Sequence, residues 1–186
     1  TCTVRNKRDT GTIEVKKTWV GGPSQTTLKI GTTAGGSDKG SQLTDANGTT
    51  NQTTGIKTLP TGTYYVSETA VPNYDKTLVC TNKGTEFTPG ANEAITLAKG
   101  DQVVCTYTNT KRGSIELKKA WVGTPGTTTL KIGTAAGAQD IDFQDTANGL
   151  TTGPNSVAAG TYHLSETALA DYDGLLTCTG GAATSA

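Results

Sequence analysis

The sequence predicts an all-β protein made of two tandem β-sandwich modules with about seven short strands each. Apolar and polar residues alternate in short runs that are rich in β-branched and aromatic residues, and no segment keeps a helical period. Clusters of Gly, Pro, Asn and Ser separate these runs, as in turns. The runs of the first half recur in the second half in the same order, roughly a hundred positions later, which indicates a tandem repeat.

The first strand of each module shows the repeat most clearly. Residues 11–21 read GTIEVKKTWVG and residues 113–123 read GSIELKKAWVG. Because successive side chains of a strand point to opposite faces, Lys17 and Lys119 share a face with the apolar residues, whereas Lys16 points the other way. A lysine that faces a core is costly unless it is paired or neutral. These two lysines are therefore candidate functional residues.

The next strands follow in matching order in both modules. They are expected at residues 27–31, 62–69 and 74–80 in the first module and at 128–133, 160–167 and 172–178 in the second. A last strand at 102–109 completes the first module, and it has no counterpart after Cys178. The other copy of its sequence lies at residues 1–6. We therefore divide the chain into a terminal strand of a preceding or neighbouring module (1–8), a complete module (9–110) and a module that lacks its last strand (111–186).

Two further polar side chains are expected to face the core of the first module. Glu68 follows Val66 with the same parity, and Asn109 follows Tyr107 with the same parity. The sequence thus places an inward-facing Lys17, an inward-facing Glu68 and an inward-facing Asn109 on three different strands.

The cysteines indicate an oxidising compartment. Cys80 and Cys105 flank a hydrophilic excursion between two strand-like runs, and we interpret them as a disulfide. Closing a loop of this length would stabilise the fold by about 3 kcal/mol. The alternative is a pair of buried free thiols. A metal site is not expected, because the sequence has no CxxC motif and a single His.

Composition argues against several functional classes. The formal net charge is zero and 17% of the residues are charged, so neither nucleic acid nor an anionic membrane is an expected partner. No apolar run approaches the roughly 20 residues of a membrane span. The sequence offers no Ser/His/Asp set and no phosphate-binding glycine loop, so we expect neither an enzyme with an external substrate nor a cofactor. It contains no Met and begins with Thr1, so a processed chain or an excerpt is expected.

These motifs, in this order, resemble the prealbumin-like (Cna protein B-type) repeat domains of bacterial surface proteins and pilins. The matching elements are G-x-I-x-V-x-K at residues 11–17, G-T-Y-x-V-x-E-T at residues 62–69 and T-N-T at residues 108–110. The resemblance covers both modules, and the additional cysteines resemble repeats of large actinobacterial surface proteins. It implies Ig-like or prealbumin-like sandwiches displayed outside the cell, at the cell surface.

The resemblance also implies a self-formed isopeptide bond. Lys17 would be the nucleophile, Asn109 the electrophile that loses ammonia, and Glu68 the acid that shuttles the proton. Burial lowers the pKa of a lysine and raises that of a carboxylic acid, so both can be neutral together in an apolar site. The alternative is a Lys17–Glu68 ion pair at the edge of the module, with Asn109 making hydrogen bonds only.

The second module lacks the strand that would bring an Asn and a second Cys. We expect a strand equivalent to residues 1–6 to complete it, added head to tail from another copy of the chain. The pairs across this joint would be Cys2 with Cys178 and Asn6 with Lys119, with Glu166 as the proton shuttle. In the alternative, the chain is a window on a longer array whose missing strand lies downstream. Closure within the chain is disfavoured, because residues 9–11 tie the first strand to the first module.

The predicted function is structural: a repeat unit of an extracellular bacterial filament, pilus or surface stalk, whose partners are copies of itself. The alternative is a long single-chain adhesin. In that hypothesis the loops at 32–58 and 134–156, which differ in length and sequence between the modules, would bind a carbohydrate or a host protein.

Overall fold

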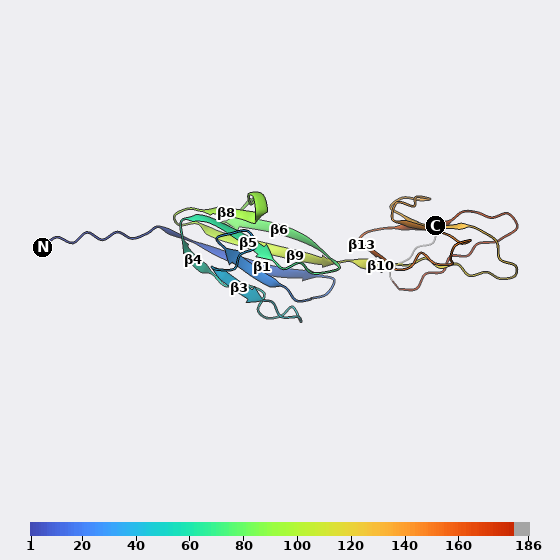
Figure 1. The fold of residues 1–186 in the computed structure, drawn as a ribbon, viewed down its shortest axis with the longest axis horizontal. Coiled ribbons are helices and arrows are strands. Elements are labelled where there is room, and N and C mark those ends of the chain that lie inside the picture. Colours follow the sequence, from blue (N-terminus) through green and yellow to red (C-terminus); the bar gives the residue numbers. More distant parts are fainter. Residues whose placement is uncertain (181–186) are drawn as a thin grey trace. The chain divides into compact units, whose positions relative to one another are not determined.

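The structure is a computed structural model that describes residues 1–180. The chain divides into two compact units at the Arg112–Gly113 peptide bond (Figure 1). The described residues form β-strands and one short 3₁₀ turn, so the all-β prediction is confirmed. Residues 1–9 belong to no strand, and their side chains are exposed.

Unit 1 is built from two sheets that enclose one core, and most of the neighbouring strands in these sheets are antiparallel. The first sheet has the order β4-β1-β9-β6-β7, with strands Lys57–Pro60, Thr10–Val20, Gln102–Lys111, Tyr74–Asn82 and Thr85–Phe87. The second has the order β3-β2-β5-β8, with strands Gly40–Leu43, Thr27–Gly31, Gly62–Glu68 and Ala94–Leu97, and the 3₁₀ turn η1 (Ala91–Glu93) precedes β8. These are more strands than the seven expected, because β3, β4, β7 and β8 lie in segments whose composition indicates loops.

The core of unit 1 lies between the two sheets because alternate side chains of their strands point inward. Both sheets contribute buried residues to this core, namely Ile13, Val15, Leu28, Ile30, Val66, Ile95, Leu97, Val103 and Tyr107. The predicted disulfide between Cys80 and Cys105 is present in this core and is completely buried. The two cysteines face each other across the β6–β9 ladder with Cα atoms 4.0 Å apart.

The central strand β9 determines where the polar residues of unit 1 lie. It runs parallel to β1, with Lys17 opposite Tyr107 and Trp19 opposite Asn109. It runs antiparallel to β6, with Lys76 opposite Asn109. Lys17 and Asn109 therefore lie on neighbouring strands, two positions out of register, and both side chains are buried on the core side.

Unit 2 has smaller sheets. Strand β10 (Gly113–Ile115) pairs with β13 (Asn155–Val157), and β11 (Thr129–Gly133) lies between β12 (Asp142–Asp145) and β14 (His163–Glu166). Its core contains Leu117, Leu130 and Ile132, with Ile115, Ile141 and Leu164 packed against them.

Two strands expected in unit 2 are not formed, and this corrects the sequence prediction. The first strand ends at Ile115 instead of continuing to Trp121, and residues 172–178 form no strand. In unit 1 the corresponding segments are held by β9, which pairs with residues 12–20 of β1 and with residues 74–82 of β6. The described part of unit 2 contains no equivalent of β9. The segment after Ile115 therefore bonds on one side only, around the isolated Lys118–Thr151 bridge, and residues 172–178 have no ladder to join.

Candidate functional site

Lys17 and Glu68 form a buried ion pair that links the two sheets of unit 1. The Lys17 side chain is 0% exposed and that of Glu68 is 1% exposed, and Nζ lies 2.8 Å from Oε2. Lys17 reaches the interior because the alternation of β1 continues past Val15, and Glu68 is the last residue of β5. Both residues therefore occupy the inward positions that strand parity predicts.

Asn109 is the third polar residue of this site. It is 1% exposed, and it lines a pocket of about 160 Å³ together with Glu68. Its Oδ1 is buried and has no hydrogen-bond partner among the described residues. Lys17 Nζ and Glu68 Oε2 also lack one, because their close contact does not have the angles of a hydrogen bond. Leaving a buried polar atom such as Asn109 Oδ1 unsatisfied costs about 1–3 kcal/mol.

Burial and Glu68 shift the pKa of Lys17 in opposite directions. Burial is the larger effect and lowers the pKa of Lys17, while the close contact with the carboxylate of Glu68 and its negative charge oppose that shift. The Trp19 ring covers the amine, with its centroid 4.5 Å from Nζ. On the other side, Lys17 and Trp19 line a second pocket of about 350 Å³. A deprotonated lysine amine is a nucleophile, so this site has the elements for attack on a neighbouring carboxamide.

Unit 2 repeats the lysine, the glutamate and the tryptophan. Lys119 Nζ lies 2.7 Å from Glu166 Oε2 and 4.5 Å from the centroid of the Trp121 ring. The side chains of Lys119 and Glu166 are 16% and 30% exposed, so this pair is more open than its counterpart in unit 1. Within residues 113–180, no asparagine occupies the place that Asn109 has in unit 1.

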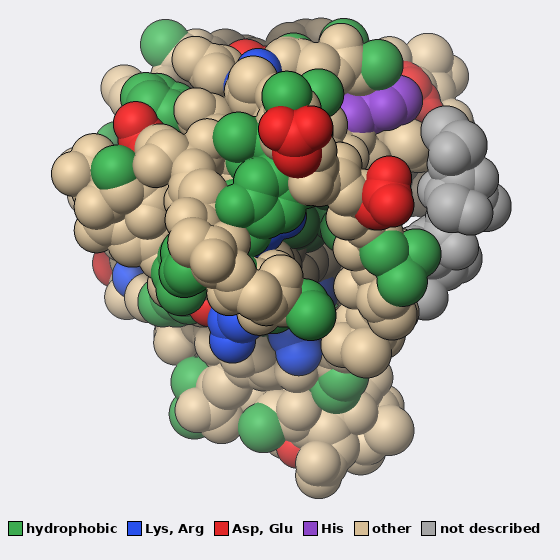
Figure 2. Space-filling view, turned by 90° about the vertical axis from the view of Figure 1, so that its right-hand side faces the viewer, with side chains coloured by type: hydrophobic (Ala, Val, Ile, Leu, Met, Phe, Trp, Pro, Cys, Tyr) green, Lys and Arg blue, Asp and Glu red, His purple; other side chains and the backbone are tan. Residues whose placement is uncertain are grey.

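The remaining predicted residues lie outside any assembled site in one chain. Cys2 and Cys178 are free and exposed, and Asn6 is exposed in the segment before β1. Unit 2 also exposes Leu175, which is 92% accessible, and Leu176, which is 48% accessible. Figure 2 shows hydrophobic side chains at the surface of the face that it draws. The pairing of Cys2 with Cys178 and of Asn6 with Lys119 stays a prediction.

Sequence reasoning missed an aromatic pair that closes each lysine site. Trp19 packs edge-on against Tyr74, with ring centroids 5.3 Å apart, and Trp121 packs in the same way against Tyr172 at 5.4 Å. Each tyrosine hydroxyl donates to a backbone carbonyl in the loop that follows the tryptophan, at Gly22 in unit 1 and at Thr124 in unit 2. The repetition of both aromatic residues in the two modules was the signal that could have revealed the pair.

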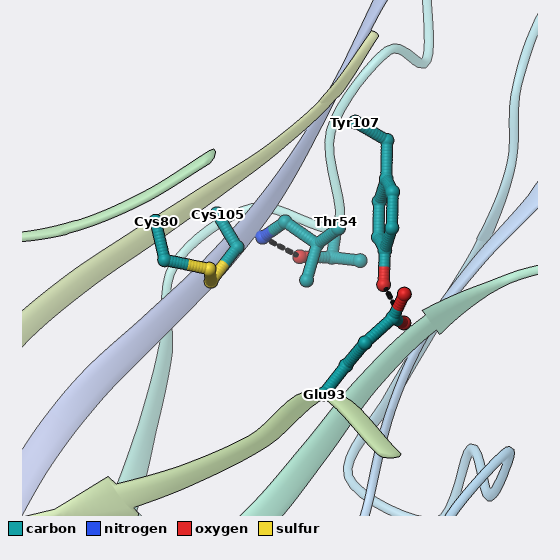
Figure 3. Close-up of a disulfide and its surroundings, with 6 residues drawn as sticks. Thr54, Cys80, Glu93, Cys105 and Tyr107 are labelled. Atoms are coloured by element: carbon teal, nitrogen blue, oxygen red, sulfur yellow. Dashed lines mark hydrogen bonds between the residues drawn. A yellow bond between two sulfur atoms is a disulfide. The ribbon is translucent and has the colours of Figure 1, made fainter. Parts of the chain in front are cut away.

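A second polar cluster, which we call the Glu93 cluster, was also missed. The Tyr107 hydroxyl donates to Glu93 Oε2, and Lys76 Nζ donates to Glu93 Oε1 at 2.7 Å. Figure 3 shows the Tyr107 side chain directed toward the Glu93 carboxylate. Burial and the neighbouring Glu93 raise the pKa of Tyr107, so its hydroxyl stays protonated. Glu93 lies in η1, outside any periodic segment, so no sequence pattern marked it.

The two loop regions considered as ligand-binding loops contain short strands and internally bonded turns. Asp38 accepts hydrogen bonds from the backbone and hydroxyl of Thr32, and Asp140 accepts the same two from Thr134. The acidic groups therefore order their own turns. A ligand-binding role for these loops stays a prediction.

Comparison with known proteins gives two matches to family models, both described as a prealbumin-like fold domain. One covers residues 3–111, which is more than half of the chain, and the other covers residues 117–186. No curated protein matches the chain. Among solved structures, a leucine-rich repeat protein from Bacteroides thetaiotaomicron VPI-5482 is 13% identical with a TM-score of 0.27. The match covers 84% of this chain but 21% of that one, and so low a score supports no argument about fold.

Proposed function

Because the chain belongs to the family of prealbumin-like fold domains, we propose that it is a structural repeat unit of an extracellular bacterial filament, pilus or surface stalk. Domains of this family serve structural roles in surface proteins of the pilin type, and the family is not an enzymatic one. The observation that supports the proposal most directly is the buried Lys17–Glu68 pair beside Asn109. No helix among residues 1–180 combines the length and the apolar character needed to cross a bilayer.

The proposed chemistry joins β1 to β9 covalently. The neutral amine of Lys17 attacks Cγ of Asn109, a C–N bond forms, and the former carboxamide nitrogen leaves as ammonia. Glu68 takes a proton from the attacking amine and delivers it to the leaving nitrogen, so one proton moves and no oxidant is needed. Enforced proximity in the closed core lowers the barrier, because no reactant has to be captured from solution. The product is a neutral amide, which replaces the buried amine of Lys17 and the carboxamide of Asn109 in the core.

Intact-mass measurement tests this bond. We expect the reduced wild-type chain to be lighter than its sequence by one ammonia, and a Lys17–Asn109 linked peptide to appear after proteolysis. Lys17→Ala, Asn109→Ala and Glu68→Ala should each have the full sequence mass. Lys16→Ala is the matched control and should still lose ammonia, because Lys16 is exposed on the opposite face of β1. A wild-type chain of full mass would contradict the proposal.

We further propose that a strand with the sequence of residues 1–6 completes unit 2 in the array. Residues 2–6 repeat the sequence pattern of Cys105–Asn109, the part of β9 that supplies the disulfide cysteine and the asparagine of unit 1. Such a strand would pair with the segment after Ile115, which has only the isolated Lys118–Thr151 bridge, and with the segment around Cys178. It would also cover Leu176, whose counterpart Leu78 packs against the core of unit 1. It would come from another copy of the chain or from another part of a longer array.

Non-reducing electrophoresis separates these two sources. If separate copies join, the chain should form a ladder that collapses with reductant and is absent in Cys2→Ser or Cys178→Ser. A product of fixed size that neither reductant nor these substitutions change would favour a longer array. An Asn6–Lys119 bond would appear as a linked peptide in the ladder bands, and Asn6→Ala would remove it without removing the disulfide.

A further inference from the structure

The Glu93 cluster lies beside the residues of the proposed isopeptide reaction, and none of its side chains takes part in the bond formation described above. Lys76 and Tyr107 belong to the sheet that contains β1, whereas Glu93 immediately precedes β8 of the other sheet. Glu93 binds both of them, so it forms a second polar link between the sheets. Lys76 also lies over the Tyr107 ring, with Nζ 5.2 Å from the centroid. Its ammonium group is thus restrained by a carboxylate and an aromatic face.

This restrained cation belongs to the same pocket as the reacting groups. Lys76 is directly opposite Asn109 in the β6–β9 ladder, and the two residues line the same pocket as Glu68. The side chain of Lys76 is 44% exposed, so it stands where the pocket meets solvent, while Asn109 lies at its buried end.

We propose that Glu93 and Tyr107 hold the Lys76 ammonium at the mouth of this pocket so that its charge accelerates bond formation between Lys17 and Asn109. The inference rests on the proposed isopeptide bond and adds the group that sets its rate. Lys76 contributes no atom to the new bond. Glu93 is a positioning residue that acts through Lys76.

Two electrostatic effects favour the reaction. A nearby positive charge opposes protonation of Lys17, and Lys76 adds to burial in lowering the pKa of that amine. The attack also places negative charge on Oδ1 of Asn109, which has no donor among the described residues, and a cation close by stabilises that charge. Among the described residues, the titratable groups of this region include Glu68 from β5, Lys76 from β6, Tyr107 from β9, and Glu93 from η1, whose carboxylate pairs with Lys76. Glu68 acts in the opposite direction, and Tyr107 stays neutral.

The backbone beneath the cluster is unusual for its residue types. Asn92 and Glu93 have φ values of 57° and 62°, in the left-handed region. Two such residues in succession cost free energy that surrounding contacts must offset, and strain of this kind concentrates at functional sites.

In the second module Gly174 stands at the position of Lys76, so that module carries the lysine–glutamate pair without the cation.

The rate of ammonia loss tests this inference. Unreacted chain, recovered in denaturant from insoluble expression, is refolded at a series of pH values and followed by intact mass. Lys76→Met should react about tenfold more slowly at a given pH, and its rate profile should move to higher pH by about one unit. Lys76→Arg should restore most of the rate. Lys16→Met removes a lysine charge from the outer face of β1 and should react like the wild type.

Each outcome is decisive. If the wild type loses ammonia and Lys76→Met has the same rate and pH profile, this inference is wrong and the isopeptide proposal stands. If the wild type never loses ammonia, the isopeptide proposal itself fails. Near-ultraviolet circular dichroism checks that each variant folds. Lys76→Gln, which can still donate to Glu93, replaces Lys76→Met if that variant does not fold, with the same expected result.

Discussion

The two units contain the same lysine, glutamate and tryptophan in nearly the same geometry, yet only one unit encloses them. The Lys17–Glu68 pair is essentially inaccessible to solvent, whereas Lys119 and Glu166 keep 16% and 30% of their side-chain surface exposed. This difference in exposure is explained by β9, which has no equivalent in the described part of unit 2. It supplies Asn109 and a disulfide cysteine, and it pairs with both β1 and β6. The lysine–glutamate contact is therefore local to each unit, and its enclosure depends on one additional strand.

Supplying that strand to unit 2 should have the largest effect. A peptide with the sequence of residues 1–8, or the same segment fused after the second module, should order residues 116–121 and 172–178. The amides of Glu116, Lys118, Ala120 and residues 172–178 should gain protection comparable with that of β1 and β6, because the added strand gives them a ladder. The amides of Leu117 and Lys119 already donate to residues 150–152 and should change less. Hydrogen–deuterium exchange measures this directly. A scrambled segment of the same composition is the control. Equal protection with both segments would contradict the conclusion that a strand of this sequence completes unit 2.

Truncating the β9 side chain that fills the core should be the next largest effect. Tyr107→Ala removes a fully buried ring, and we expect a loss of about 3–5 kcal/mol in the free energy of unfolding of unit 1. Tyr107→Phe keeps the ring but removes the hydroxyl that donates to Glu93 Oε2, and about 1 kcal/mol should be lost. Denaturant unfolding, read from amides of each unit, should show unit 2 unchanged. A parallel loss in unit 2 would show that the units do not fold separately.

Removing the disulfide should cost slightly less. Cys80→Ala/Cys105→Ala opens a loop with a sequence separation of 25, and a loss of about 3 kcal/mol is expected for unit 1. Calorimetry of this variant and of Cys2→Ala/Cys178→Ala gives a matched comparison, because the second pair is exposed and unbonded in a single chain. Equal destabilisation by both double substitutions would contradict the view that the Cys80–Cys105 disulfide is the link that stabilises unit 1.

The smallest effect should be a pH dependence confined to unit 1. In Asn109→Ala the amine of Lys17 remains free, with its pKa held below the ordinary lysine value of 10.5. The unfolded chain then binds more protons than the folded one between these two pKa values, so unit 1 should become more stable as pH rises toward 10.5. Adding Lys17→Met to this variant should abolish that slope, and unfolding titrations from neutral to alkaline pH measure it. An unchanged slope would exclude Lys17 as its source.

Strand parity predicted the candidate site well because it is a local property. Lys17, Glu68 and Asn109 are buried as the alternation of their strands requires, and Cys80 and Cys105 meet because their strands are adjacent. The roles of these residues remain proposals.

Features that depend on distant partners were not predictable in the same way. The short strands β3, β4, β7 and β8 exist because a neighbour offers them a ladder, and each is too short, within a largely polar segment, to be marked by its own sequence. The strand expected to reach Trp121 fails for the converse reason, since its sequence is suitable and its partner is missing from the described residues. Glu93 was missed because a left-handed backbone, without any periodic pattern, brings it to Tyr107.

The parallel pairing of β1 with β9 has a mechanical consequence. These are the first and last strands of unit 1, and they lie side by side over nine paired positions from Thr12–Gln102 to Val20–Thr110. Tension applied at Thr10 and Lys111 pulls the two strands lengthwise past each other, so all the hydrogen bonds between them are loaded at once. With the proposed Lys17–Asn109 bond in place, tension would pass from β1 into β9 through a covalent link. The chain between these two residues would then carry almost none of the load, and the unit could transmit force without extending.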